Sequence, residues 1–390
     1  MTMKVLHWHE WCGELMAVLN YGTIIRFDFG AVEHLSSALE KFDVKRPMII
    51  SDAGLRAAGL IDRIVGSLGA LTPLPVYDGT PGNPTEEAVT EALTIFQSEG
   101  CDGVICLGGG SPMDLGKAVA LLAQSGGSLE QYDPLKGGNK RVKGVAPLIA
   151  IPTTAGTGSE ASTGFVISMN DGRKLTFVNQ LFMPKLSLCD PELTFGLSSQ
   201  TTAATGMDAI THCIEAILAP GVNPPADGIG LDGLWRGWRH LQRAVEDGSD
   251  RQARWEMMMA STEGALAFVK GLGAVHSMSH AAGRIKSLRL HHGTLNAVIL
   301  PAVLRFNESV CATAYARIRQ AMGLREDADL AVEIERMNAR IGLPSGLSAM
   351  GLTADLIEDM VPHALSDLAN RTNPRPVSAE DYAVLFREAM

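Results

Sequence analysis

The stretch Leu107-Gly108-Gly109-Gly110-Ser111-Pro112-Met113-Asp114 decides the fold. It follows the apolar run Gly103–Leu107 and precedes apolar residues at helical spacing, so it predicts a strand, a tight turn and a helix. The successive glycines allow a sharp turn and close approach of a ligand. We expect Ser111 to cap the helix, Pro112 to open it and Asp114 to complete a capping pair. Bare amides at such a helix start favour an anion such as a diphosphate, although an ordinary strand-to-helix turn has the same residues.

Short apolar runs alternate with helical patterns on both sides of this turn, and the motif lacks the GxGxxG spacing of a conventional dinucleotide fingerprint. Such alternation is typical of a parallel sheet covered on both faces, with its ligand crevice at the C-terminal ends of the strands. The first half is therefore predicted to be a doubly wound α/β domain. Strands are predicted in residues 18–29 (strand or hairpin), Pro47–Ser51, Leu74–Tyr77, Gly103–Leu107 and Pro147–Ile151, and helices at Gly30–Leu39, Ala57–Leu68 and Thr85–Glu99.

Strand patterns fade after Asp190-Pro191, and the second half is predicted to be all-α. We place the domain boundary near residue 195, so the two domains are 1–195 and 196–390. A Pro-rich connector is expected at Pro220–Asp227. Helices are predicted at Ser198–Leu218, Gly228–Glu246, Arg251–Val269, His276–Lys286, Leu295–Phe306, Leu330–Ile341, Ala354–Ala364 and Ala379–Ala389.

The bulk composition is that of a globular protein, with 46% hydrophobic and 19% charged residues among 390. The net charge of -10 argues against nucleic acid or an anionic membrane as the partner. Six cysteines without a CxxC spacing suggest reduced thiols. The segment Met1–Gly13 lacks the apolar core of a signal peptide, and no apolar run approaches the roughly 20 residues of a membrane span. We expect a soluble, cytoplasmic protein.

A second informative stretch runs from Gly206 to Ala216 and reads as a helix. Asp208 and His212 are four residues apart, so they lie on one face, where they suit either a metal ion or an ordinary ion pair. His276 and His280 repeat the same spacing. With His291 and His292 following, these residues favour a metal site. Histidine and carboxylate ligands without cysteine suit Fe(II), zinc or a similar divalent ion.

Two further features suit a nucleotide. The loop Ile151–Glu160 follows a strand and offers hydroxyls and amides in a run. Asp52 ends an earlier strand, where a carboxylate accepts hydrogen bonds from ribose hydroxyls and repels a 2′-phosphate. Taken alone, the loop is better explained as an ordinary Ser/Thr/Gly turn, and Asp52 is equally compatible with a solvated turn.

Together these stretches resemble the iron-containing (group III) alcohol dehydrogenase family from about Tyr21 to the C-terminus. The resemblance implies a dinucleotide-binding α/β domain, a helical metal-binding catalytic domain, and the architecture also found in dehydroquinate synthase. It implies NAD, with NADP less favoured, and a divalent metal in the cleft between the domains. The most specific matches are Gly108–Asp114, Pro152–Glu160, Asp190–Ala216 and Gly271–Pro301.

The resemblance also implies roles for individual residues. His280 matches a position beside the nicotinamide and substrate, so it is the expected proton carrier, whereas His291 matches no functional position. The implied metal ligands are Asp208, His212, His276 and His292. The implied cofactor residues are Asp52 (which favours NAD), Asn83, Gly109, Gly110, Ser111, Asp114, Thr153, Thr154, Thr157, Ser162 and Lys174.

Two departures bear on the substrate. The segment between His276 and His292 is about two residues longer than in familiar members. It carries Arg284, Lys286 and Arg289, which either favour an acidic substrate or simply face water. Gly164 stands where many relatives carry a larger residue.

The predicted activity is metal-assisted hydride transfer between NAD(P) and an alcohol or aldehyde, in a homodimer or higher homo-oligomer. A bound metal would lower the pKa of the alcohol and polarise the carbonyl in the reverse reaction. The alternatives are a metal-independent maleylacetate-type reductase, a zinc polyol dehydrogenase, a lyase or cyclase of the dehydroquinate synthase kind, and a non-catalytic nucleotide or metal sensor. The complete Asp-His-His-His set argues against the first, and net NADH production would separate a dehydrogenase from the last two.

Overall fold

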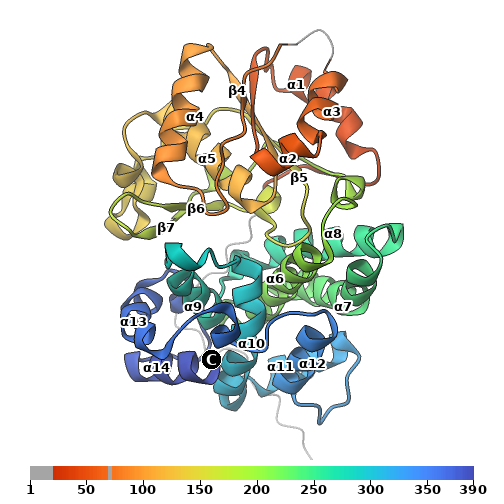
Figure 1. Cartoon of the computed structure of the whole chain (residues 1–390), viewed down its shortest axis with the longest axis vertical. Helices are drawn as coiled ribbons and strands as arrows, with labels where there is room; N and C mark the ends of the chain where they lie inside the picture. The colour runs from red at the N-terminus through yellow and green to blue at the C-terminus, as the bar shows by residue number, and fades with distance from the viewer. Residues whose placement is uncertain (1–20, 69–72) are drawn as a thin grey trace, which may run out of the picture.

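The computed structural model describes residues 21–68 and 73–390. A region built on a parallel sheet is stacked on a helical region, as Figure 1 shows from top to bottom. The predictions for the segment Met1–Gly13, for Cys12 and for residues 18–20 lie outside the described residues. The five described cysteines are free. Among the described helices, none combines the length and apolarity needed to cross a membrane.

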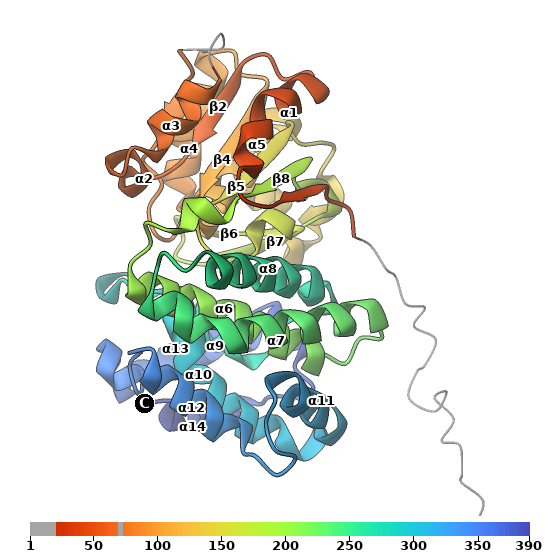
Figure 2. The same ribbon diagram turned by 90° about the vertical axis from the view of Figure 1, so that its right-hand side faces the viewer.

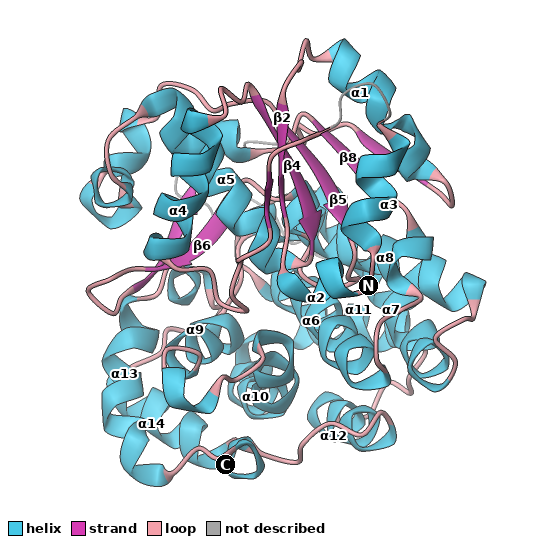
Figure 3. Ribbon diagram, turned by 45° about the horizontal axis from the view of Figure 1, so that its top comes forward, coloured by secondary structure: helices cyan, strands magenta, loops and turns pink. Residues whose placement is uncertain are grey.

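The sheet is parallel, as predicted, and has six strands. Its central strands are buried along their whole length, because helices cover both faces. Figure 3 shows the strands in magenta between these helices. The spatial order is β1 (Ile25–Phe27), β8 (Leu186–Cys189), β5 (Leu148–Pro152), β4 (Gly103–Gly108), β2 (Pro47–Ile50) and β3 (Val76–Tyr77).

The helix predicted over Ala57–Leu68 is present but begins later, at Leu60, because Gly59 takes a left-handed conformation with φ of 73° before its first residue. A separate short helix, not predicted, ends at Ala57. A 3-10 turn at Ala31–His34 precedes the first helix. The helices on the sheet are α1 (Leu35–Lys41), α2 (Ala53–Ala57), α3 (Leu60–Ser67), α4 (Glu86–Ser98) and α5 (Gly110–Ser125).

An antiparallel hairpin, absent from the sequence prediction, follows β5. It consists of β6 (Gly164–Ser168) and β7 (Lys174–Val178). Alternate residues are buried, and the rings of Phe165 and Phe177 stack with centroids 4.8 Å apart. The hairpin and β8, also unpredicted, extend strand structure nearly to residue 190.

The second region is helical, as predicted. Figure 2 shows α6, α7 and α8 as a layer between the sheet and the remaining helices. The connector predicted at Pro220–Asp227 is present but ends earlier, at Asn223, because Asn223 caps α7 and proline suits the first turn of that helix. We retain residue 195, between β8 and α6, as the proposed boundary. The helices are α6 (Ser199–Leu218), α7 (Pro224–Glu246), α8 (Arg251–Ala267), α9 (Ala274–Ala282), α10 (His292–Asn307), α11 (Ala312–Met322, not predicted), α12 (Leu330–Arg340), α13 (Ile357–Ser366) and α14 (Ala379–Glu388).

Candidate metal centre and cofactor cleft

The four predicted metal ligands converge in the structure. Asp208 and His212 lie one turn apart on α6, His276 lies on α9, and His292 is the first residue of α10. The Asp208 Oδ1 atom is 3.9 Å from His212 Nε2, 4.0 Å from His276 Nε2 and 3.8 Å from His292 Nε2. Potential ligand atoms of Asp208, His212 and His276 all lie within 4.8 Å of one another.

This donor set fits a divalent transition metal. The Asp208–histidine distances exceed hydrogen-bond range, so these acceptors surround a common point without bonding to one another. Burial lowers the pKa of His212 to about 4, and burial together with neighbouring histidines holds the pKa of His292 well below its ordinary value. The two imidazoles are therefore neutral, the form that binds a metal. The side chain of His292 is 29% exposed, so the centre opens on that side.

Buried Glu215 fixes the orientation of His276. The Nδ1 atom of His276 lies 2.5 Å from Glu215 Oε2, and the other carboxylate oxygen accepts a hydrogen bond from the Val275 amide at 2.8 Å. Burial lowers the pKa of His276, but the hydrogen bond to Glu215 and the nearby carboxylates together outweigh burial and raise the pKa overall. With Nδ1 engaged, His276 directs Nε2 toward the common point. His212 is held in the same way by the Gly156 carbonyl, 3.2 Å from its Nδ1 atom.

Asn296 holds the carboxylate of Asp208. It lies one turn after His292 on α10, and its Nδ2 atom donates a hydrogen bond to Asp208 Oδ1 at 2.6 Å. The same nitrogen is 3.2 Å from His276 Nε2 and 3.1 Å from His292 Nε2. The amide therefore borders the centre and holds its acceptors in place.

His280 stands apart from these ligands, as expected. Its Nδ1 atom lies 2.9 Å from Asp367 Oδ2, and its ring stacks on His292 with centroids 5.3 Å apart. Burial raises the pKa of Asp367, but the charge and hydrogen bond of His280 outweigh it and lower the pKa overall. Asp367 thus remains an anionic acceptor that leaves His280 Nε2 available for proton transfer.

The glycine turn after β4 presents the start of α5, but Ser111 does not cap that helix. The N-cap position belongs to Gly109, and the Ser111 hydroxyl donates a hydrogen bond to the Gly82 carbonyl at 2.8 Å. A Cβ atom at Gly110 would lie 3.0 Å from Thr157 Cγ2. Glycine thus allows this close approach and leaves the helix start without a side-chain cap, which suits an anion.

The capping role expected for Asp114 is also wrong. Its buried carboxylate accepts hydrogen bonds from Ser159 Oγ at 2.8 Å and from the Val166 amide at 2.9 Å, so it ties α5 to the following loop and to the hairpin. Ser162 likewise supports the loop by accepting a hydrogen bond from the Gly164 amide at 3.0 Å. A role of either side chain toward the cofactor stays a prediction.

The remaining residues that were predicted to bind the cofactor lie after β5 and at the hairpin. Thr153 is buried beside Thr154, whose buried Oγ1 atom has no hydrogen-bond partner in the described region. This atom is 3.2 Å from the point that a Cβ atom on Gly109 would occupy. An orphaned hydroxyl beside bare amides fits a polar ligand such as a dinucleotide phosphate. The Lys174 Nζ atom donates a hydrogen bond to Asn83 Oδ1 at 3.1 Å.

Asp52, at the end of β2, accepts a hydrogen bond from the Leu55 amide and caps α2. This bond uses one carboxylate oxygen, Oδ1, at 3.0 Å. The residue therefore occupies the strand end that the sequence predicted, on the edge where β4 and β5 also end.

Comparison with known proteins gives a consistent result. Residues 22–191 match the model of the iron-containing alcohol dehydrogenase family, and residues 202–390 match the model of its C-terminal region. The chain is 49% identical over 383 residues to 4-hydroxybutyrate dehydrogenase of Cupriavidus necator, covering 96% of this chain and all of the relative. The chain belongs to the iron-containing alcohol dehydrogenase family.

Two other members extend the comparison. The NAD-dependent methanol dehydrogenase of Bacillus methanolicus is 33% identical over 93% of this chain and 96% of its own. The crystal structure of a 1,3-propanediol oxidoreductase superposes with a TM-score of 0.87 at 31% identity, covering 96% of this chain and all of that one. This family member is thus an NAD-dependent oxidoreductase that acts on CH–OH groups and uses a divalent metal.

Three supporting residues of this dehydrogenase site were missed by sequence reasoning. Glu215 lies three residues after His212, and Asn296 four after His292, so helical spacing alone marks both as neighbours of a ligand. Asp367 carries no such signal, because it approaches His280 from 87 residues away.

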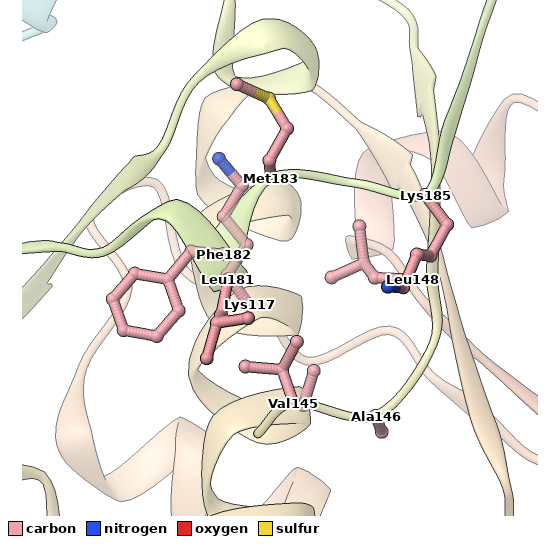
Figure 4. Close-up of a pocket in the computed structure, with 9 residues that line it drawn as sticks. Lys117, Val145, Ala146, Leu148, Leu181, Phe182, Met183 and Lys185 are labelled. Atoms are coloured by element: carbon pink, nitrogen blue, oxygen red, sulfur yellow. The ribbon is translucent and has the colours of Figure 1, made fainter. Parts of the chain in front are cut away.

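The small hollow in Figure 4 lies elsewhere and is not this site. It is lined in part by Lys117, Leu148 and Phe182. The Lys117 Nζ atom donates hydrogen bonds to the carbonyls of Ser159, Ser162 and Gly164 within 2.8 Å, so this buried lysine has a structural role.

Proposed function

We propose that Asp208, His212, His276 and His292 hold Fe(II), and that NAD is preferred over NADP. The proposal rests on the convergence of the four side chains. Three imidazoles surround one buried carboxylate, at distances that hydrogen bonds between them do not explain. Zinc suits the same donors, and Fe(II) is favoured by the family.

We further propose an ω-hydroxy acid of the 4-hydroxybutyrate type as the alcohol and its semialdehyde as the product. The support is the 49% identity to 4-hydroxybutyrate dehydrogenase over nearly the whole of both chains. A cytoplasmic homodimer or higher homo-oligomer is part of the same proposal.

The chain's own residues account for binding and proton movement. When bound, the metal would supply Lewis acidity toward the alcohol oxygen, and NAD would accept the hydride. Asp208 supplies negative charge to the site, while Glu215 and Asn296 hold the donors in their orientation. His280, held through Nδ1 by Asp367, accepts the alcohol proton at Nε2 and passes it toward solvent.

The proposal is tested by metal content and NADH formation. The wild-type protein, stripped with a chelator and reloaded with Fe(II) or Zn(II), is assayed with NAD or NADP over alcohols, diols and hydroxy acids. Asp208→Ala and His276→Ala should bind no stoichiometric metal and form no NADH. His291→Gln is the matched control, since that neighbouring side chain is exposed, and it should keep both properties. Full NADH formation by the stripped protein would refute the metal role.

A further inference from the structure

The basic residues between His280 and His292 differ in how exposed they are. Arg289 is exposed, whereas Arg284 is half-buried and reaches out of the helical region. Its Nε atom donates a hydrogen bond to the Gly172 carbonyl at 3.0 Å, in the turn that joins β6 to β7. Figure 1 shows this hairpin beside α9, at the junction of the two regions. Arg284 therefore links the helical region to the hairpin.

The guanidinium of Arg284 has unused hydrogen-bonding capacity. Its Nη1 atom is buried and has no acceptor in the part of the chain that the structure describes. No described carboxylate lies within ion-pair distance of Arg284. The nearby carboxylate of Asp171 is bound instead by Arg173 Nε at 2.7 Å. A buried donor without an acceptor is destabilising, so an anionic ligand that reaches it would be stabilised.

A second cation lies on the same side. The Lys174 Nζ atom is 3.5 Å from the Cβ position of Gly283, the residue before Arg284. Its hydrogen-bond partner is the neutral amide oxygen of Asn83. No described carboxylate forms an ion pair with Lys174 either, so two basic groups beside the hairpin lack a direct anionic partner.

These cations lie close to the metal centre. Arg284 lies four residues after His280, just beyond the end of α9, and the ring of His280 stacks on His292. A short molecule with a hydroxyl at one end and an anion at the other suits this arrangement.

We propose that Arg284 binds the carboxylate of the ω-hydroxy acid while the hydroxyl end lies at the metal centre. This inference rests on the proposed function and assigns the preference for an acidic substrate to Arg284. The planar guanidinium can hold a carboxylate through two parallel hydrogen bonds, and Lys174 adds positive potential. In a chain of net charge -10, such local positive charge is needed to attract an anionic substrate.

The test compares kcat/KM for 4-hydroxybutyrate and 1-butanol in the metal-loaded wild type, Arg284→Gln and Arg284→Lys. The Gln variant should lose about 10- to 100-fold more with 4-hydroxybutyrate than with 1-butanol, as expected for one charge-assisted pair. The Lys variant should lose less, because it keeps the charge. Arg289→Gln, in the same segment but exposed, should leave the selectivity ratio unchanged.

A second measurement does not depend on turnover. Butyrate, which has the carboxylate but no hydroxyl, is titrated calorimetrically into each metal-loaded protein. Its dissociation constant should rise about 10- to 100-fold in Arg284→Gln. Unchanged butyrate affinity, or equal losses for both substrates in a folded variant, would overturn the assignment. Wild type that oxidises neither alcohol but binds butyrate through Arg284 would instead overturn the proposed function alone.

Discussion

Replacing Glu215 by Gln should weaken metal binding without touching a ligand. The carboxylate is buried, and its two oxygens face two donors, His276 Nδ1 at 2.5 Å and the Val275 amide at 2.8 Å. Glutamine has one acceptor oxygen, so its NH2 group must face one of these N–H donors. The variant loses a negative charge and sets a donor against a donor.

The size of the effect follows from these contacts. A hydrogen bond to a charged group contributes about 1.5–3 kcal/mol, and loss of a group that orients a metal-bound histidine costs roughly 10- to 100-fold in affinity. The two figures agree, because 1.4 kcal/mol is about a factor of ten. We therefore expect the dissociation constant of the metal to rise about 10- to 100-fold in Glu215→Gln.

The assay is competition with a chelator of known affinity, using Zn(II) as the redox-inert probe. Glu263→Gln is the matched control, since that mostly buried carboxylate on α8 contacts Arg236 and none of the proposed ligands. Circular dichroism should show native helix content for both variants. If folded Glu215→Gln binds Zn(II) within about twofold of wild type, the reasoning about His276 orientation is wrong.

Two further predictions concern protonation and cofactor choice. Burial, with Asp232 alongside, raises the pKa of Glu263 to about 8, so the folded state holds a proton there that the unfolded state releases. The stabilisation from this bound proton is complete below about pH 4.5 and is lost as the pH rises through 8. Urea unfolding from pH 6 to 9 should therefore show a smaller loss of stability in Glu263→Gln than in wild type. Parallel pH profiles of the two proteins would contradict this. Asp52→Asn keeps the capping oxygen of α2 but removes the charge, so the NADP-to-NAD ratio of kcat/KM should rise about tenfold, and an unchanged ratio would contradict the predicted role of Asp52.

Much of the fold could be predicted because its signals are local. Short buried strands separated by helical patterns specify a parallel sheet, and most predicted strands and helices are present. The hairpin β6–β7 escaped prediction because its strands become recognisable only when Phe165 and Phe177 stack and alternate residues pack on α5. The cap at Ser111 was wrong because a tertiary hydrogen bond to Gly82 takes its hydroxyl.

The candidate site also combines features that the sequence determined with features that only the tertiary structure decided. Sequence alone determined the glycine turn after a strand and the spacing of Asp208 and His212, because both depend on geometry within one element. Only the tertiary structure decided which donors orient the site. Glu215 meets His276 across 61 residues and Asn296 meets Asp208 across 88, and such pairings leave no periodic trace. It also decided that Arg284 reaches the hairpin turn while Arg289 faces solvent, because burial depends on the packing of distant segments.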